Sequence, residues 1–298
     1  MDSAADDPSQ PAAAPPEDRR GWWDWFVALH EARGHVHPLG PSHAAALFGP
    51  GPVLIVSFEL ADDVHARLPA RLPLGLEVAR AEGWSHLCLV ATGPSWFRDP
   101  DVWAAFDRLV DDGFFEDFDE VVFYGAGMGG YAAAAFSVAA PGATVVAVRP
   151  QATLSPDLAE WDDRFLAARR LDFTSRYGFA PDMAEGAERL FLLYDPDDTR
   201  DAMHAALFAR PNVTRLRCRY LGPRPEEALD AMGLTADLLR LAGRGRLTPR
   251  TLRAAFRARR DHPARILRLL ARLTLKSRAD LATRVARHVL RPAPPRRP

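Results

Sequence analysis

The stretch DEVVFYGAGMGGYAAAAFSVAAPGATVVAVRPQ, residues 119–151, decides the fold of this chain. It reads as an apolar strand, a sharp glycine turn, an alanine-rich helix and a second strand. Two unrelated turns begin in this way. A nucleophile elbow, G-x-S-x-G, would put a catalytic side chain at Gly127. A dinucleotide-binding turn, G-x-G-x-x-G, would use Gly125, Gly127 and Gly130 to admit a pyrophosphate.

Working outward, the other strands are apolar throughout rather than alternating. Such strands are buried on both faces, and helices between them predict a parallel sheet covered on both sides. The strands are expected at residues 52–60, 85–92, 119–125, 142–149, 188–195 and 212–222. Helices are expected at residues 21–33, 75–84, 99–113, 156–170 and 199–209, and five short helices follow residue 224.

Charge is distributed unevenly along the 298 residues. Residues 244–298 carry 17 basic and 2 acidic side chains, against 21 basic and 37 acidic in the remainder. We expect the basic helices to dock on the acidic body, or to contact a protein partner or a second subunit. Nucleic acid is not expected to bind, because Phe256 is the only aromatic residue in the basic region that could stack on a base.

The ends and the cysteines indicate a compartment. Residues 1–18 are acidic, rich in Pro and Ala, and predicted to be a disordered tail without the features of a signal peptide, and residues 291–298 a frayed tail. No run of about 18 apolar residues predicts a membrane span. Cys88 and Cys218 lie in apolar runs. We expect buried free thiols, which suit a reducing cytoplasm.

The order of the parts distinguishes the two turns. A dinucleotide-binding unit normally opens its domain, whereas here two strands precede the turn. In the α/β-hydrolase fold the elbow follows the third strand, counted from the strand before the oxyanion loop. An acid loop is expected two strands later, and YDPDD follows the strand at 188–195. We therefore predict a three-layer α/β-hydrolase-like fold: residues 19–223 form a mostly parallel six-stranded sheet domain, and residues 224–290 a helical appendage.

The residues that would perform hydrolysis are missing from those places. Gly127 stands at the nucleophile position without a side chain, and Pro223 stands where the histidine is expected. Only the acid loop persists, with Asp195 and Asp197 as candidates. Loss of nucleophile and base removes the acyl-enzyme route at the elbow. The backbone N–H of Met128 could still act as an oxyanion donor.

Three segments carry a resemblance to a known group. FYGAGMGGYAA, RPQATLSPDLAEWDDRF and LYDPDDTRDAMHAALF resemble α/β-hydrolase-like bacterial proteins, whose relatives carry GSSMGGYAA and SPQFSIDP at these places. The resemblance covers residues 50–230. Versions with the glycine turn are often catalogued as phosphoadenosine phosphosulfate reductases. That chemistry needs an S-G-G-x-D-S phosphate loop and a C-terminal reactive cysteine, and this chain has neither.

In an open parallel sheet, ligands bind beyond the carboxyl ends of the strands. The chain puts a cationic and polar group of residues there, together with acids and one histidine. The predicted ligand-binding residues are Arg98, Gly125, Met128, Arg149, Gln151, Asp201 and His204. Each has a structural alternative: Asp197 or Asp198 caps a helix, His204 is a satisfied histidine, and Arg149 pairs with Asp195. No metal site is expected.

These observations predict a degenerate protein that binds a small polar or anionic ligand or a protein partner, without a cofactor. A homo-oligomer is compatible with the sequence. Two alternatives stay open. One is an oxidoreductase that binds NADP or FAD at the Gly125–Gly130 turn. The other is a hydrolase with a displaced nucleophile, Ser95 or Ser155. Strand order and the group above Gly127 distinguish these possibilities.

Overall fold

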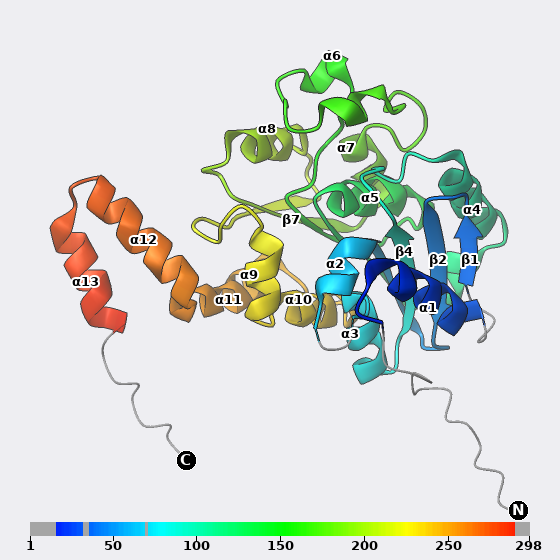
Figure 1. Ribbon diagram of the computed structural model, residues 1–298, viewed down its shortest axis with the longest axis horizontal. Helices are drawn as coiled ribbons and strands as arrows, with labels where there is room; N and C mark the ends of the chain where they lie inside the picture. Colours follow the sequence, from blue (N-terminus) through cyan, green and yellow to red (C-terminus); the bar gives the residue numbers. More distant parts are fainter. Residues whose placement is uncertain (1–15, 32–35, 69–70, 290–298) are drawn as a thin grey trace, which may run out of the picture.

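The computed structural model describes residues 16–31, 36–68 and 71–289 (Figure 1), so nearly all of the two predicted tails lies outside the described residues. One sheet of eight strands runs through the described part, in the order β1-β2-β4-β3-β5-β6-β7-β8. The strands are β1 Val36–Leu39, β2 His43–Phe48, β3 Val53–Leu60, β4 Ser85–Ala91, β5 Glu120–Ala126, β6 Thr144–Val148, β7 Arg189–Tyr194 and β8 Val213–Arg217.

Strands β3 to β8 are parallel, while β1 and β2 join the β4 edge antiparallel. The six predicted strands are therefore confirmed, but the sheet has eight. The two missed strands have weak sequence signals. HAAALF in β2 is rich in alanine, which is depleted in strands. The four residues of β1 include a proline, which an edge strand tolerates.

Helices cover both faces of the sheet, as three-layer α/β folds require. The helices of this part of the chain are α1 Arg19–Glu31, α2 Ala61–Ala66, α3 Leu74–Glu82, α4 Pro100–Asp111, α5 Met128–Phe136, α6 Pro156–Ala159, α7 Ala180–Met183 and α8 Thr199–Leu207. The helix predicted at 156–170 is interrupted, with a 3-10 turn only at Leu166–Arg170. Its middle is a loop in which the Asp162 side chain accepts a hydrogen bond from the Arg164 backbone, an interaction that competes with helix formation.

Alternate residues of the central strands enter two apolar layers. Phe58 of β3 and Phe123 of β5 lie in the layer under α4 and α5. Ile55 and Val122 face the opposite layer, which contains side chains of α3 and of two C-terminal helices, α10 (Leu234–Gly243) and α11 (Pro249–Ala255). A third cluster holds the α1 tryptophan Trp22, which is fully buried and donates from its indole to the Arg71 carbonyl. Packing of the N-terminal tryptophans on the sheet is thus confirmed for Trp22.

The C-terminal helices are α9 Pro225–Ala231, α10 Leu234–Gly243, α11 Pro249–Ala255, α12 Pro263–Leu275 and α13 Ala279–Val289. Helices α12 and α13 pack on each other at the end of the molecule away from β1 (Figure 1). Docking is mainly apolar, through buried Leu252 and Phe256. Among the described residues, Arg244 with Glu82 is the ion pair that the basic segment makes with the acidic body. The expected electrostatic dock is therefore not what holds these helices. None of the described helices has the length and apolar character that crossing a membrane requires.

Candidate functional site

The turn between β5 and α5 has the backbone of a nucleophile elbow. Gly127 lies at φ +56° and ψ −120°. Its N–H donates to the Val148 carbonyl at 2.9 Å, and its own carbonyl accepts from the Tyr131 N–H at 3.0 Å. A side chain at such a position costs about 1–3 kcal/mol of strain, which glycine avoids. The backbone thus keeps the geometry of an elbow, with a glycine at the position where a nucleophile would stand.

The Arg149 guanidinium fills the space above this turn. A Cβ atom at position 127 would lie 3.4 Å from Arg149 Nη2 and 3.5 Å from its Cζ. Arg149 donates to both carboxylate oxygens of Glu226, from Nε at 2.8 Å and from Nη2 at 2.6 Å. Glu226 is the second residue of α9 and follows β8, close to the exposed Pro223 where a base was expected. An ion pair therefore lies over the position where an elbow carries its nucleophile, and its acid follows Pro223 by three residues.

Both members of this pair are charged at neutral pH. Burial alone would raise the pKa of Glu226, but the hydrogen bonds and charge of Arg149 lower it below its ordinary value. Burial would likewise lower the pKa of Arg149, and its bonds to Glu226 raise it instead. The prediction that Arg149 pairs with Asp195 was wrong, because its partner is Glu226. Asp195 accepts from the Asp197 backbone N–H at 2.9 Å.

The other glycines of the turn serve close packing of α5 on the sheet. A Cβ at Gly125 would stand 2.1 Å from the Gly129 carbonyl oxygen, and a Cβ at Gly129 would stand 2.1 Å from that of Phe58. A Cβ at Gly130 would stand 3.1 Å from the Val148 carbonyl. Backbone rather than open space faces these positions, so the prediction of Gly125 as a ligand-binding residue is not supported by its surroundings.

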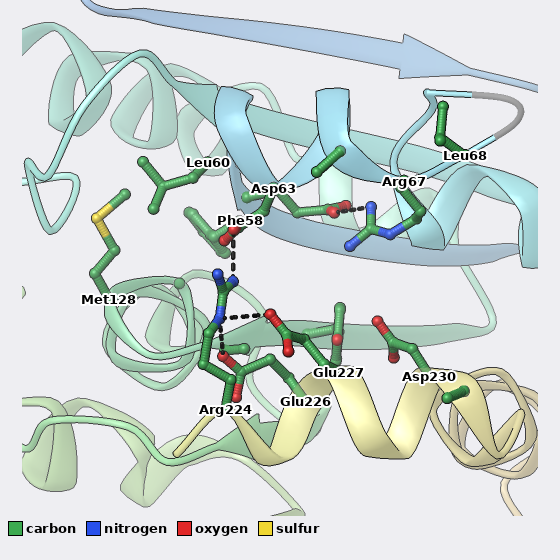
Figure 2. Close-up of a pocket in the computed structure, with 16 residues that line it drawn as sticks. Phe58, Leu60, Asp63, Arg67, Leu68, Met128, Arg224, Glu226, Glu227 and Asp230 are labelled. Atoms are coloured by element: carbon green, nitrogen blue, oxygen red, sulfur yellow. Dashed lines mark hydrogen bonds and ion pairs between the residues drawn. The ribbon is translucent and has the colours of Figure 1, made fainter. Parts of the chain in front are cut away.

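A cavity of about 530 Å³ opens beside the elbow (Figure 2). Leu60 at the end of β3 and Met128 at the start of α5 both line it. These are the two places from which the fold draws oxyanion donors. Of the seven predicted ligand-binding residues, Met128 alone lines this cavity, whose wall consists of Phe58, Glu59, Leu60, Asp63, Ala66, Arg67, Leu68, Tyr124, Ala126, Met128, Gly129, Arg224, Glu226, Glu227, Asp230 and Ala231.

The charged side chains of the cavity wall are mainly acidic, with five carboxylates and two guanidiniums. Figure 2 shows Arg224 spanning the cavity between α2 and α9, 2.6 Å from Asp63 and 3.1 Å from Glu227. Arg67 lies 2.7 Å from Glu59. Burial raises the pKa of Asp230, although a hydrogen bond from the Thr235 hydroxyl opposes the rise. The acids thus outnumber the arginines that neutralise them.

The predicted cationic cup does not form, since its members have other partners. The Arg98 guanidinium donates to the backbone carbonyls of Asp172 and Arg176 at 2.6 and 2.8 Å and stacks on Trp103 at 4.4 Å. Gln151 accepts from the Trp96 indole at 2.9 Å. These side chains fasten loops to the core, and with Arg149 paired to Glu226 none of the three is directed at a ligand.

His204 is a satisfied, fully buried histidine. The Ala152 backbone N–H donates to its Nδ1 at 3.1 Å, which leaves the proton on Nε2 to be donated to Asp162 at 2.9 Å. Arg164 bonds the same Asp162 carboxylate at 2.8 Å and reaches Asp201 at 2.7 Å. Asp162 and Arg164 were missed, because the residues that they join are about 40 positions further along the chain.

The acid loop survives as a structural feature. The Asp198 side chain accepts from the backbone N–H groups of Arg200 and Asp201 and caps α8, as one interpretation of the sequence predicted. Asp197 lies 3.2 Å from Arg219. The described acids of this loop are therefore used for capping and surface pairing.

Two further groups of reactive side chains lie away from the elbow. Ser95 Oγ lies 2.7 Å from His43 Nε2, whereas Ser155 is buried and has no such base among its described contacts.

Possible ligand atoms of Glu59, His86 and Cys88 lie within 4.8 Å of one another. The Glu59 carboxylate is already bonded by Arg67 and by the Ser57 hydroxyl, so this cluster is an internally paired network. Both cysteines are free and buried, as predicted.

Neither protein-family models nor curated proteins match this chain. Solved structures resemble it at low identity. A carboxyl esterase 2 from the fungus Tuber melanosporum is 15% identical, with a TM-score of 0.43, over 67% of this chain and 84% of the other. A capsule O-acetyltransferase of Neisseria meningitidis serogroup A is 10% identical, with a TM-score of 0.44, over 68% and 93%. Mouse alpha/beta hydrolase domain-containing protein 10 is 11% identical, with a TM-score of 0.42, over 69% and 96%. At these TM-scores the likenesses assign no activity to this chain. Its own strand order and glycine turn are those of an α/β-hydrolase-like fold.

Proposed function

We propose that this α/β-hydrolase-fold chain is a binding protein whose elbow forms no acyl-enzyme. One observation carries the proposal. The Arg149 guanidinium lies over Gly127, where a hydrolase carries its nucleophile, and donates from two of its nitrogens to the Glu226 carboxylate. We infer that this pair stands where a hydrolase needs nucleophile and base. The fold keeps a cavity at the oxyanion position, and a cavity of about 530 Å³ has the size of a small-molecule site.

The charge of the wall supports a small polar ligand that carries positive charge. Five carboxylates and two guanidiniums line the cavity, and Arg224 already places a guanidinium among Asp63, Glu226 and Glu227. A ligand amine or guanidine would occupy the same environment when Arg224 turns aside. An anionic ligand has less support, because Arg98, Arg149 and Gln151, which were expected to bind it together, each have other partners in the chain.

The oxidoreductase alternative has less support. Four strands, β1 to β4, precede the strand that leads into the glycine turn, and the Arg149 guanidinium lies over Gly127, the glycine that would admit a pyrophosphate. We retain binding without a cofactor, and a cytoplasmic location that suits two buried free thiols, as parts of the proposal. A protein partner remains open for the basic C-terminal helices.

A thermal-shift screen of the full chain tests the proposal. Agmatine and spermidine serve as cationic probes, with AMP and glucose 6-phosphate as anions and with NAD, NADP and FAD for the alternative. We expect a rise in melting temperature with a cationic probe, because a ligand that binds only the folded state stabilises it. Asp230→Asn and Glu227→Gln should reduce the rise. Asp157→Asn, which removes an exposed acid on α6, is the matched control.

The outcome separates the two ligand classes. A shift with NAD, NADP or FAD would replace the proposal by the oxidoreductase alternative. A shift with the anions alone, or a cationic shift that Asp230→Asn and Glu227→Gln leave unchanged, would show that the acidic cavity is not the binding site.

A further inference from the structure

Ser95 lies beside an imidazole that has no role at the elbow. Ser95 follows β4, and His43 begins β2, which runs antiparallel to β4 with His43 opposite Ala91. The antiparallel pairing brings both residues to the same edge of the sheet. Ser95 Oγ and His43 Nε2 are 2.7 Å apart, which is the contact of a nucleophile with its base. None of the cavity-lining residues described above belongs to this group.

An acid stands on the other side of the imidazole. His43 Nδ1 is buried without a hydrogen bond and lies 3.6 Å from Asp99 Oδ2. The second Asp99 oxygen accepts from the Asp101 backbone N–H at 2.9 Å, which caps α4 and fixes the carboxylate. Asp99 favours the tautomer with its proton on Nδ1, and Nε2 is then free to accept the Ser95 hydroxyl proton. Such contacts are often long before a substrate binds and tighten during reaction.

The loop that carries Ser95 is held rigidly. Trp96 and Phe97 both adopt left-handed backbone conformations, with φ +50° and +54°, which non-glycine residues seldom do. Their side chains are buried: Trp96 donates to Gln151, and Phe97 packs edge-on against Phe58. The Phe97 N–H donates to Ser95 Oγ at 3.1 Å. Ser95 itself is only half-buried, so part of the residue is exposed to solvent.

We propose that Ser95, His43 and Asp99 form a nucleophilic site, separate from the elbow, that takes acyl groups from small esters. Ser95 Oγ attacks the ester carbonyl carbon while His43 Nε2 accepts the hydroxyl proton, and Asp99 stabilises the resulting imidazolium. The bond from carbon to the leaving oxygen then breaks, His43 returns the proton to that oxygen, and the alcohol departs. A water molecule, deprotonated by His43, then attacks the acyl carbon. The bond from that carbon to Ser95 Oγ breaks, His43 returns the proton to Oγ, and the acid leaves.

This site consists of residues that do not line the proposed ligand cavity, so an experiment can refute one proposal and leave the other intact. Turnover should be slow. The oxyanion position of the fold is at the elbow, two strands from Ser95, and loss of one oxyanion donor costs about 10²–10³ in rate. Covalent capture is therefore a more sensitive test than hydrolysis. With an alkyl fluorophosphonate, an O–P bond forms at Ser95, the P–F bond breaks, and fluoride leaves while His43 takes the proton.

The experiment treats the full chain with this fluorophosphonate and maps the adduct by peptide mass spectrometry. We expect one adduct, on Ser95, and none in Ser95→Ala. His43→Gln should slow labelling about 100-fold or more, the contribution of a general base. Asp99→Asn, which keeps an N-cap for α4, should slow it at least about 10-fold. Ser155→Ala, whose side chain does not cap α6, should label at the wild-type rate.

Melting curves establish that each variant is folded at the labelling temperature. The absence of an adduct on the wild-type chain would overturn the proposal, as would an adduct elsewhere that survives Ser95→Ala. An unchanged labelling rate in folded Asp99→Asn and His43→Gln would show that Ser95 reacts without the imidazole and carboxylate, which also overturns it.

Discussion

The ion pair over the elbow should act as one unit in stability. The perturbation is a double-mutant cycle with Arg149→Met, Glu226→Gln and the two together. The Arg149 side chain is 20% exposed and that of Glu226 is 9% exposed. Removing one partner from a fully buried pair costs about 3–5 kcal/mol. Partial exposure of Arg149 reduces this figure, and we expect about 2 kcal/mol for Glu226→Gln, since Arg149 then keeps a single weak acceptor.

The two single variants should differ in cost. Arg149→Met leaves Glu226 with Arg224, whose Nε is 3.3 Å away, so we expect about 1 kcal/mol. The double variant should cost about as much as Glu226→Gln alone, which gives a coupling energy of about 1 kcal/mol. Urea unfolding measures all three, and a loss of about 2 kcal/mol corresponds to a fall of roughly 4–8 °C in melting temperature.

Two outcomes of the double-mutant cycle would contradict this reasoning. If the single costs add within about 0.5 kcal/mol, the two charges do not stabilise each other. If the double variant loses more unfolding free energy than the two single variants lose together, the pair is not the element that closes the elbow. Either result would refute the reasoning that an ion pair replaced nucleophile and base.

The remaining predictions concern a buried cluster and the C-terminal helices. Burial would raise the pKa of Asp162, but bonds from His204 and Arg164 lower it below its ordinary value. Its stabilisation is therefore present above about pH 4 and is lost as the pH falls further. Asp162→Asn should cost about 2 kcal/mol at pH 7, and calorimetry should find the difference from wild type shrinking between pH 5 and 3. An undiminished difference at pH 3 would contradict the assignment. Deleting residues 262–298 should leave the melting temperature within a few degrees of wild type, because one α12 residue is buried and none of α13. Deleting residues 244–298 also removes three buried apolar side chains, which cost about 5 kcal/mol together, so equal stability of the two truncations would refute apolar docking.

Sequence patterns were sufficient for the centre of the fold. Long apolar strands with helices between them leave few arrangements other than a covered parallel sheet, and the glycine turn after the third strand indicated an elbow. The missed strands β1 and β2 are short and contain proline or several alanines, so their pairing partner determines their conformation more than their own propensity does.

The site was harder to predict, because its contacts are distant in sequence. Arg149 and Glu226 are 77 residues apart, and His43 and Ser95 are 52 apart. No spacing rule connects such residues, and each alone has an ordinary structural interpretation. Arg98 and Gln151 follow strands and so looked available to a ligand, but their side chains turn to neighbouring loops. The prediction that Gly127 stands at the nucleophile position of an elbow depended only on residue identity and the order of the parts, and both could be read from the sequence.

The elbow itself provides the most direct test of the central claim that it forms no acyl-enzyme. The measurement is fluorophosphonate labelling and acyl-ester turnover of Gly127→Ser, made in a chain that also carries Ser95→Ala, with Ser95→Ala alone as the control. A serine at φ +56° beneath the Arg149 guanidinium should destabilise the fold by about 1 kcal/mol or more. We predict no adduct on the peptide that contains position 127 and no turnover above the control. An adduct there, with turnover that Arg149→Met leaves intact or raises, would contradict the account.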